Sequence, residues 1–380
     1  MESLVNGSSR PTTPAMTISP PSSPLATDMD HILSHTSGLW EALRDARVFI
    51  TGGTGFIGRW LLESFVEANR RFDLSAQAVV LTRNPDRFKN RAPRLAADPA
   101  LRLVQGDVRT LAAGEITRQL GVNEPARFSF VIHGASETTL SANEREPVKV
   151  LETSLEGTRR ALDFAVESGA KNFLLLSSGA VYGEQPPAMT QVPESYRGAP
   201  DVALPLSAYG EGKRLAEMLC AIYQRAHGLD CRLARCFAFV GPYLALDAHY
   251  AIGNFLADVL ARRPIAVKGD GTPWRSYMYA ADLAVWLWTL LLDPRATGTY
   301  NVGSGCACTI REMAECVARL GPTPVPVTVA RAADPSRPAS RYVPDVTRAK
   351  RELGLDSWIS LEQAVRRTLT FHQQSQIASL

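Results

Sequence analysis

The chain has 380 residues, of which 45% are hydrophobic and 21% are charged, values typical of a globular protein. Its 41 basic and 38 acidic residues give a formal net charge of +3 without any basic block, so we expect no nucleic-acid partner. The six cysteines form no CxxC pair and no histidine cluster accompanies them. This pattern argues against a metal site and predicts reduced thiols in a cytoplasmic protein.

The N-terminal segment differs in composition from the rest of the chain. Residues 1–28 are rich in Ser, Thr and Pro and lack the apolar region of a secretory signal, so we expect a disordered tail. A short helix is expected within 29–46. The apolar run VWLWTLLL at 285–292 lies between Asp282 and Asp293 and is too short to cross a bilayer. It predicts a buried helix, and the chain is not expected to enter a membrane.

Apolar runs and helical patterns alternate through the first two thirds of the chain. Strands are expected at 47–51, 78–81, 101–105, 128–133, 172–178 and 231–241. Such alternation predicts an α/β fold, a doubly wound parallel (Rossmann) sheet with both faces covered and right-handed crossovers. We place an NAD(P)-binding Rossmann domain at 29–241. Residues 242–380 should mainly form a smaller C-terminal substrate-binding lobe, with parts of 183–206 contributing.

A glycine-rich segment, TGGTGFIG, follows the first expected strand and opens a helix. Gly52 permits a tight turn, Gly55 lets the backbone approach a pyrophosphate, and Gly58 lets helix and strand pack closely. Phe56 and Ile57 carry the chain from the loop into the helix, whose unpaired N–H groups attract phosphate. A purely structural glycine turn is the alternative. The strand–loop–helix order favours a dinucleotide site and hence an NAD(P)-dependent enzyme.

Two further segments bear on the cofactor, which is NAD or NADP. The second strand ends in Thr82 and Arg83 rather than the acidic residue that would bind a ribose 2′-hydroxyl. An arginine there neutralises a 2′-phosphate, so the sequence leans toward NADP(H), although Arg83 could equally be a solvated surface residue. Asp107 and Val108 follow the third strand, where Asp107 suits an adenine contact; a simple turn is the alternative.

Three polar residues at strand ends predict acid–base chemistry. Tyr209 and Lys213 lie four apart in SAYGEGK, on one face of an expected helix. A tyrosine with a pKa near 10 is a poor base at neutral pH, and a nearby ammonium group favours its phenolate. Ser178 ends the fifth strand and could hydrogen-bond the reacting oxygen opposite Tyr209. Beside a nicotinamide, these groups would form a hydride-transfer site.

As a set, the motifs resemble those of the extended short-chain dehydrogenases/reductases of the sugar-nucleotide epimerase/dehydratase family. The matching segments lie within residues 46–305, and RYVPDVTRAKRELG resembles the family's C-terminal segment. The segments occur in the family's order: TGGTGFIG, GDV, VIHGAS, SSGAVYG, YGEGK, RCFAFVGP and GDGTPWRSYMYAADLA.

The resemblance implies hydride exchange between a sugar ring carbon, usually C4, and the nicotinamide of the cofactor. Tyr209 would be the acid/base for the sugar hydroxyl, and Ser178 would polarise the same oxygen. Lys213 would lower the pKa of the tyrosine and bind the nicotinamide ribose. Arg275 in GDGTPWRSY would grip the substrate diphosphate, as a guanidinium can do bidentately. Thr138 is a further expected substrate-binding residue.

The sequence departs from the family pattern where dehydratases carry an Asp-Glu pair after the catalytic hydroxyl residue. Those positions are Gly179 and Ala180, which have no acid or base to offer, so a 4,6-dehydratase and a Glu-dependent decarboxylase are disfavoured. Ala238 replaces the Asn of the family's R-x-x-N-x-x-G-P motif, and Ser154 stands where an Asn is usual. The residue after His133 also differs from the usual apolar one. These changes affect substrate identity more than cofactor binding.

Several functions therefore remain open. The first is a C4 epimerase or a 4-keto reductase acting on a nucleoside-diphosphate sugar, with a dehydratase or decarboxylase as the alternative. The others are a reductase of a non-sugar ketone on the same fold and a non-catalytic nucleotide-sensing protein. By family analogy we expect a homodimer formed through helices covering about 151–168 and 208–226.

Overall fold

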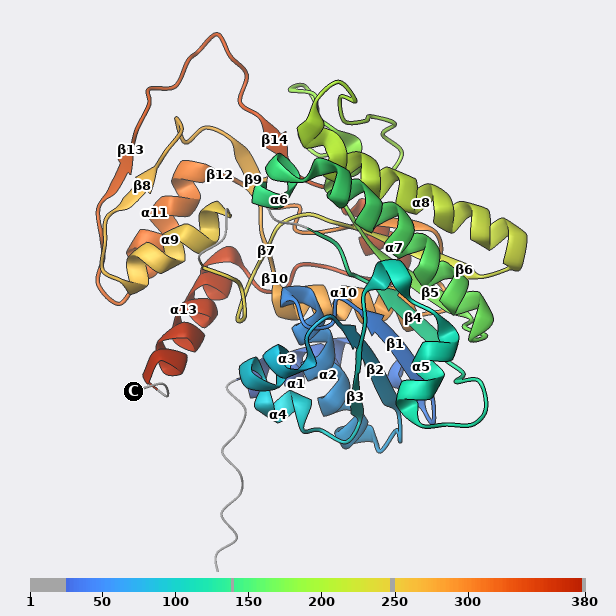
Figure 1. Ribbon diagram of the computed structural model, residues 1–380. Coiled ribbons are helices and arrows are strands. Elements are labelled where there is room, and N and C mark those ends of the chain that lie inside the picture. The colour runs from blue at the N-terminus through green and yellow to red at the C-terminus, as the bar shows by residue number, and fades with distance from the viewer. Residues whose placement is uncertain (1–24, 138–139, 247–249, 378–380) are drawn as a thin grey trace, which may run out of the picture.

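The computed structural model describes residues 25–137, 140–246 and 250–377, and it contains a seven-stranded main sheet (Figure 1). The strand order is β11-β6-β5-β4-β1-β2-β3, and every neighbouring pair is parallel. The predicted doubly wound fold is thus confirmed. The strands are β1 Arg47–Thr51, β2 Gln77–Thr82, β3 Leu101–Gln105, β4 Phe130–His133, β5 Asn172–Ser178, β6 Asp230–Cys236 and β11 Thr299–Val302.

Both faces of this sheet are covered, because successive side chains of each strand point to opposite sides. In β1, Val48 and Ile50 pack into one apolar cluster and Phe49 packs into the other. The first cluster includes α1 (Ala26–His35), α2 (Phe56–Phe72) and α10 (Ala280–Leu292). The second includes α5 (Ala113–Leu120), α7 (Pro147–Glu167) and α8 (Ala208–His227). Figure 1 shows α7 and α8 side by side on the outside of the sheet.

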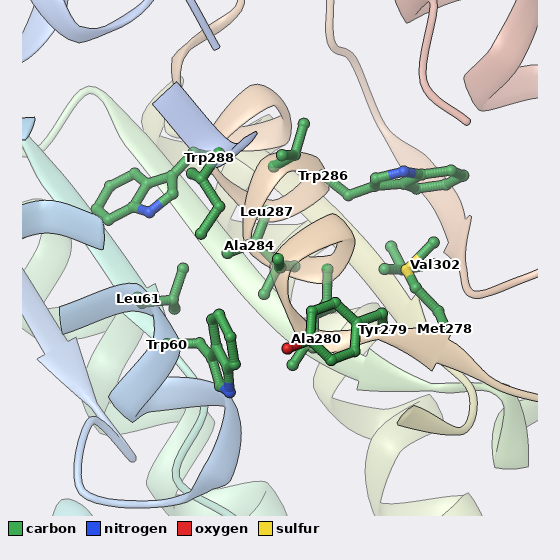
Figure 2. Packing of buried hydrophobic residues seen from close by; sticks show 14 of the residues in the cluster. Trp60, Leu61, Met278, Tyr279, Ala280, Ala284, Trp286, Leu287, Trp288 and Val302 are labelled. Atoms are coloured by element: carbon green, nitrogen blue, oxygen red, sulfur yellow. The ribbon is translucent and has the colours of Figure 1, made fainter. Parts of the chain in front are cut away.

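Helix α10 is the centre of the larger cluster, and every one of its residues is buried. Trp286 and Trp288 point to opposite sides of α10, with Trp60 of α2 on the Trp288 side (Figure 2). Each of these indole N–H groups has a partner, since Trp60 donates to Pro242 O, Trp286 to Asp356 O and Trp288 to Ser64 Oγ. The buried helix predicted at 285–292 is confirmed. Within the described ranges, no helix is long and apolar enough to cross a membrane.

The end of the segment predicted as a disordered tail is folded into the protein. Leu25 and Asp28 are buried, although both fall in the range predicted as a tail. Asp28 accepts hydrogen bonds from Tyr279 and from Arg367, far along the chain. Local composition carries no sign of such distant partners. Residues 1–24 lie outside the described part of the chain.

The last expected strand of the Rossmann pattern, 231–241, is divided in the structure. β6 ends at Cys236, and β7 (Phe239–Val240) leaves the main sheet to pair with β10 (Met278–Tyr279). The seventh strand, β11, and the central helix α10 come from within 242–380. The range assigned to the substrate-binding lobe therefore also supplies parts of the main sheet and its helical layer. β11 has only four residues and was not visible in the apolar pattern.

The remaining elements of the C-terminal part form a lobe above the carboxyl ends of the main strands. One small sheet has the order β12-β9-β14, built from Ala307–Thr309, Trp274–Ser276 and Arg341–Tyr342. A second small sheet pairs β8 (Ile265–Val267) with β13 (Val327–Val329).

The α-helices not yet named come from both parts of the described chain. They are α3 Pro85–Arg91, α4 Pro93–Ala96, α6 Leu140–Arg145, α9 Ala251–Leu260, α11 Ile310–Leu320, α12 Thr347–Leu353 and α13 Leu361–Ile377.

Candidate active site

The glycine loop after β1 has the shape that a dinucleotide requires. Gly52 has φ +75°, a conformation that glycine adopts at little cost. A Cβ on Gly52 would lie 2.5 Å from Gly134 C and 2.7 Å from Ala135 N, so the loops after β1 and β4 approach each other closely. A Cβ on Gly58 would collide with the backbone of Gly52 and Gly53. The close helix–strand contact predicted for Gly58 is therefore present.

The N-terminus of α2 is open to an anion. Gly55 is the N-cap residue and has no side chain to cap the helix, and the first turn contains no acidic residue. Phe56 and Ile57 begin the helix and are half-buried. At the neighbouring end of β4, the buried Ser136 Oγ finds no partner among the described residues. Free helical N–H groups and an unpaired hydroxyl beside them fit the phosphates and sugars of NAD(P).

The end of β2 presents the predicted arginine to solvent. Arg83 is exposed and precedes α3, which is capped by Asn84 accepting a hydrogen bond from the Arg87 N–H. Arg83 is close enough to Asp107 to contribute to the lowered pKa of that carboxyl. The main cause is Arg109, whose guanidinium donates to both carboxylate oxygens of Asp107. If Asp107 contacts adenine, it must do so with a carboxylate that is already paired with Arg109. This pairing was not predicted from the sequence.

Val108 plays a packing role in the structure. It is buried in the apolar cluster beneath α7, and a Cβ on Gly157 would lie 2.9 Å from its Cγ1. Gly157 therefore lets α7 approach the turn that follows β3. In this way the Val108 side chain fixes the backbone that carries Asp107 at the edge of the cofactor crevice.

Ser178 and Tyr209 meet at the carboxyl edge of the sheet. Ser178 is the last residue of β5, and its Oγ accepts a hydrogen bond of 3.1 Å from the Ala180 N–H in the following turn. Tyr209 lies in the first turn of α8, which packs against β5 and against the turn that follows it. Burial raises the pKa of Tyr209, and the nearby Ser178 opposes that shift. Their shared catalytic role stays a prediction.

Lys213 lies one turn further along α8. Its Nζ donates to Leu176 O at 2.8 Å and is 6.0 Å from the centre of the Tyr209 ring. Burial lowers the pKa of Lys213 to about 8, which is a direct consequence of removing an ammonium group from water. In this arrangement Ser178, rather than Lys213, is the neighbour that lowers the pKa of the phenol.

A neutral histidine, His133, connects the ends of two strands to a helix next to the candidate site. His133, at the end of β4, is hydrogen-bonded through Nδ1 to Thr51 Oγ1 at 2.8 Å and through Nε2 to Thr158 Oγ1 at 3.1 Å. Burial lowers its pKa to about 3, so it is uncharged at neutral pH. Thr51 also accepts from the Ala135 N–H. This chain of bonds holds the ends of β1 and β4 to α7.

A partly buried ion pair between α8 and β6 was not found from the sequence. Arg235 Nη2 lies 2.6 Å from Glu217 Oε2, and Ser177 Oγ donates to Glu217 Oε1 at 2.6 Å. Glu217 follows Lys213 by one helical turn in KRLAE, so the same helical spacing that selected Lys213 could have selected it. The pair fixes α8 against β5 and β6.

Arg275 lies on β9, away from the main sheet. It is paired with Cys308 of β12 on one side and with Tyr342 of β14 on the other. Burial lowers the pKa of Arg275, and its Nη1 donates to Trp274 O at 2.8 Å. Tyr342, which the sequence offered only as part of a C-terminal segment, has its hydroxyl oxygen 2.7 Å from the place that a Cβ on Gly179 would occupy. Thr138 lies outside the described residues.

A cavity of about 590 Å³ lies on the other face of the small sheet, because Trp274 lines it and neighbouring strand residues point to opposite faces. It is therefore separate from the side of β9 that carries Arg275. The cavity is lined by Asp270, Gly271, Thr272, Trp274, Thr309, Arg311, Arg331, Ala332, Ala333 and Ala339.

No group of three or more His, Cys, Asp or Glu residues suited to a metal occurs in the described ranges.

The sheet order and the loop after β1 define a doubly wound α/β protein of the dinucleotide-binding type, with polar side chains at the carboxyl edge of its sheet. The profile of the NAD dependent epimerase/dehydratase family matches residues 48–303. The chain belongs to this family, as the sequence motifs predicted.

Relatives and solved structures agree with this placement. The chain is 31% identical over 319 residues to UDP-glucuronic acid decarboxylase 5 of Arabidopsis thaliana, covering 84% of this chain and 87% of the relative. A dTDP-glucose 4,6-dehydratase from Streptomyces venezuelae, solved with NAD, has a TM-score of 0.70 and 26% identity, covering 87% of this chain and 98% of that one. The UDP-glucose 4-epimerase of Thermotoga maritima has the same fold, with a TM-score of 0.71, 20% identity, and coverage of 87% and 99%.

Proposed function

We propose that the protein is an NAD(P)-dependent enzyme acting at C4 of a nucleoside-diphosphate sugar, as a C4 epimerase or a 4-keto reductase. The observation that carries the proposal is the packing of α8, with Tyr209 in its first turn, against β5, which ends at Ser178. Lys213, one turn further along α8, donates to Leu176 O of β5. The family's relatives named above are enzymes of nucleotide sugars, which supports the substrate class.

The proposed roles follow from the geometry. The bound cofactor supplies a nicotinamide that accepts or donates the C4 hydride. Tyr209 takes the proton of the C4 hydroxyl when the ring is oxidised and returns a proton when it is reduced. Ser178 hydrogen-bonds the same oxygen, and Lys213 holds the nicotinamide ribose. Arg275 would grip the diphosphate, and Thr138 would contact the substrate.

A decarboxylase is the competing function, because curated relatives are UDP-glucuronic acid decarboxylases. Residues 179 and 180, where family dehydratases carry carboxylates, are Gly and Ala here. The structure adds a steric point, since a Cβ on Gly179 would lie 2.7 Å from both Phe237 Cζ and Tyr342 Oη. A longer acidic side chain would not fit there unless those rings moved. This supports chemistry confined to C4.

The cofactor proposal leans toward NADP(H). This proposal is supported by the exposed Arg83, which follows β2 directly where an acidic residue would favour NAD, because an arginine there could neutralise a 2′-phosphate. Titration of the protein with NADP⁺ and with NAD⁺ tests the preference. Tighter binding of NAD⁺ would rule it out.

The oligomer proposal is a homodimer built on α7 and α8. The two helices pack against each other and expose apolar side chains, which suits a helical interface. Sedimentation of the wild type and of Met218→Glu tests this, since the charge should shift a dimer to monomers. A monomeric wild type would contradict it. The exposed apolar residues are Val148, Leu155, Leu215, Met218 and Ile222.

A substrate panel tests the reaction itself. Purified protein is incubated with UDP-, dTDP-, GDP- and CDP-hexoses, their 4-keto forms and UDP-glucuronic acid, with and without NADPH. Interconversion without a change in mass indicates an epimerase, and NADPH oxidation with a gain of two hydrogens indicates a 4-keto reductase. Loss of CO2 from UDP-glucuronic acid would replace the proposal by a decarboxylase.

The panel also addresses the two remaining alternatives. Turnover of non-sugar ketones in the absence of any sugar-nucleotide turnover would indicate a different reductase. Binding of nucleotide sugars without any turnover would indicate a sensing protein.

A further inference from the structure

Glu217 joins helix α8 to two strands of the main sheet. Its carboxylate accepts from Arg235 of β6, whose Nε lies 3.0 Å from Oε1 and whose Nη2 lies 2.6 Å from Oε2. It also accepts from Ser177 Oγ of β5 at 2.6 Å. Ser177 and Arg235 are direct register partners in the sheet, so both donors come from the same level of it. Bidentate, charge-assisted bonds of this kind restrict the carboxylate to one position.

The guanidinium that holds Glu217 is itself fixed on the sheet. Arg235 lies over the ring of Tyr182, with its Cζ 4.7 Å from the ring centre, and its Nη1 donates to Glu194 O at 3.3 Å. The Tyr182 hydroxyl donates at 2.7 Å to Oδ1 of Asn301, the register partner of Arg235 on β11. Surface ion pairs are weak because both partners move freely in water. This pair is partly buried and has fixed neighbours, so it can act as a rigid support.

Lys213 lies on α8 between Glu217 and Tyr209. The three residues follow one another at intervals of four, so their side chains leave the helix on the same side. Lys213 Nζ donates to Leu176 O at 2.8 Å and is 6.0 Å from the centre of the Tyr209 ring. Because Leu176 directly precedes the serine that bonds Glu217, the ammonium and the carboxylate end at neighbouring residues of β5. An opposite charge so near favours the charged form of a buried lysine, and Glu217 opposes the lowering of the Lys213 pKa by burial.

We propose that Glu217 is a positioning residue for the C4 chemistry: it anchors α8 to β5 and β6 and holds the Lys213 ammonium group beside Tyr209. In this role Glu217 keeps its charge and exchanges no proton with the substrate. The inference rests on the proposed function, because that function gives Lys213 and Tyr209 their tasks. It requires the charge of the carboxylate, and not only the packing of the side chain.

Several other ionisable groups face Lys213, and each of them is neutral near pH 8. On the strands, burial raises the pKa of Cys236 to about 12 and lowers that of His133 to about 3. On α8, burial raises the pKa of Tyr209, and a neighbouring thiol raises that of Cys220. From α7, an uncharged serine lies against this turn of α8. Since burial lowers the pKa of Lys213 to about 8, its titration can be followed without overlap from these groups.

The first experiment follows the protonation of Lys213 by NMR without substrate or cofactor. The protein is isotope-labelled at the lysine Cε, and the Lys213 signal is identified by its loss in Lys213→Met. In Glu217→Gln the titration midpoint should fall by about 1 pH unit, because the isosteric amide removes the charge but keeps the shape. Glu211→Gln is the matched control, since Glu211 lies on the same helix and pairs with Arg214 at 3.5 Å. It should leave the midpoint unchanged. Equal midpoints in the wild type and Glu217→Gln would overturn the inference.

A double variant covers the case in which Glu217→Gln does not fold. Removing one partner of a buried ion pair leaves the other charge uncompensated, which is strongly destabilising. Glu217→Gln combined with Arg235→Gln removes both charges and leaves two amides that can bond to each other. This protein still lacks the carboxylate, so the midpoint of Lys213 should again be lower than in the wild type. A wild-type midpoint in the folded double variant would contradict the inference.

A pH profile then relates the contact to catalysis. With the substrate found in the panel, kcat should fall as pH rises through the pKa of Lys213, because the ammonium form is lost. In Glu217→Gln this basic limb should move to lower pH by the shift seen in the NMR titration, with KM changed by less than about threefold. A purely structural defect would lower kcat equally at every pH, and that result would reject the positioning role.

The two measurements also separate failure of the inference from failure of the proposed function. A lower NMR midpoint in Glu217→Gln, without turnover of any substrate by the wild type, would support the contact and remove the proposed reaction. An unshifted midpoint together with C4 turnover would support the reaction and overturn the role of Glu217.

Discussion

The glycine loop after β1 and the approach of β14 to the turn after β5 lie at the same edge of the sheet but arise in different ways. In the loop, Gly52 and Gly58 lie close in sequence and adopt their geometry through backbone conformation and local packing. In the contact, Tyr342 reaches Gly179, the residue after Ser178, only because β14 pairs with β9. The first arrangement is local and visible as a motif. The second depends on how two parts of the fold meet.

The two regions contribute to different parts of the proposed function. The glycine loop and the Ser178–Tyr209–Lys213 set carry the proposed cofactor binding and acid–base chemistry. The lobe that carries Arg275 and Tyr342 touches the position, Gly179, at which this chain departs from the dehydratase pattern. Substitutions in the glycine loop or in the Ser178–Tyr209–Lys213 set should abolish cofactor binding or activity. Substitutions in the lobe that carries Arg275 and Tyr342 should change substrate recognition and proton transfer.

The largest effect is expected from Tyr209→Phe. Removing the acid/base should lower kcat by about a thousandfold, because general acid–base catalysis contributes about 10²–10⁴. Cofactor affinity should change by less than about twofold. Steady-state kinetics and cofactor titration check both quantities. Tyr223→Phe is the control, since Tyr223 lies on the same helix and bonds to Asp163. Substantial activity in Tyr209→Phe would refute the catalytic assignment.

The substitution Gly52→Ala tests the glycine loop after β1. The added methyl would press on the backbone of Gly134 and Ala135, so the loop must shift and cofactor affinity should fall at least about tenfold. Gly38→Ala is a matched control, because Gly38 also has a positive φ of +83° but nothing lies within 4 Å of its Cβ position. Fluorescence titration with NAD(P)⁺ measures the change. Equal affinities in the two variants would show that the close approach is unimportant.

Arg275→Met tests the distant lobe. Losing a diphosphate contact should raise KM for the sugar nucleotide about tenfold or more, while kcat and cofactor affinity stay near the wild-type values. Arg341→Met is the control, since Arg341 stacks on Trp274 at 4.9 Å on the adjacent register position. If both variants behave alike, Arg275 has no special role in substrate binding.

The smallest effect concerns His133 and acid stability. Its folded pKa of about 3 lies below the ordinary value of 6.5, so the unfolded chain binds a proton that the folded chain does not. Stability is therefore lost as pH falls below about 6.5, by about 2 kcal/mol between pH 7 and pH 5. His133→Gln should lose less stability over this interval than the wild type in denaturant unfolding. His227→Gln, at an exposed position, should lose as much as the wild type.

Much of the main sheet was predictable because each strand is a continuous apolar run between turn residues. β1, β3 and β5 begin and end at the predicted residues. β11 was missed because its four residues are followed at once by a glycine-rich turn. Leu25 and Asp28 were assigned to the tail because their buried partners lie far along the chain. Arg109 was missed because its pairing with Asp107 depends on the geometry of a short turn.

The sequence by itself determined the dinucleotide fold, the glycine loop and the family, because these depend on local periodicity, on backbone conformation and on short motifs. It also showed that Gly179 and Ala180 carry no acid or base. Only the tertiary structure decided what occupies the space beside Gly179, because the occupant, Tyr342, comes from a strand whose position depends on pairing with β9. Pairing between distant short strands leaves no periodic trace in either one, so that contact could be seen only in the folded chain.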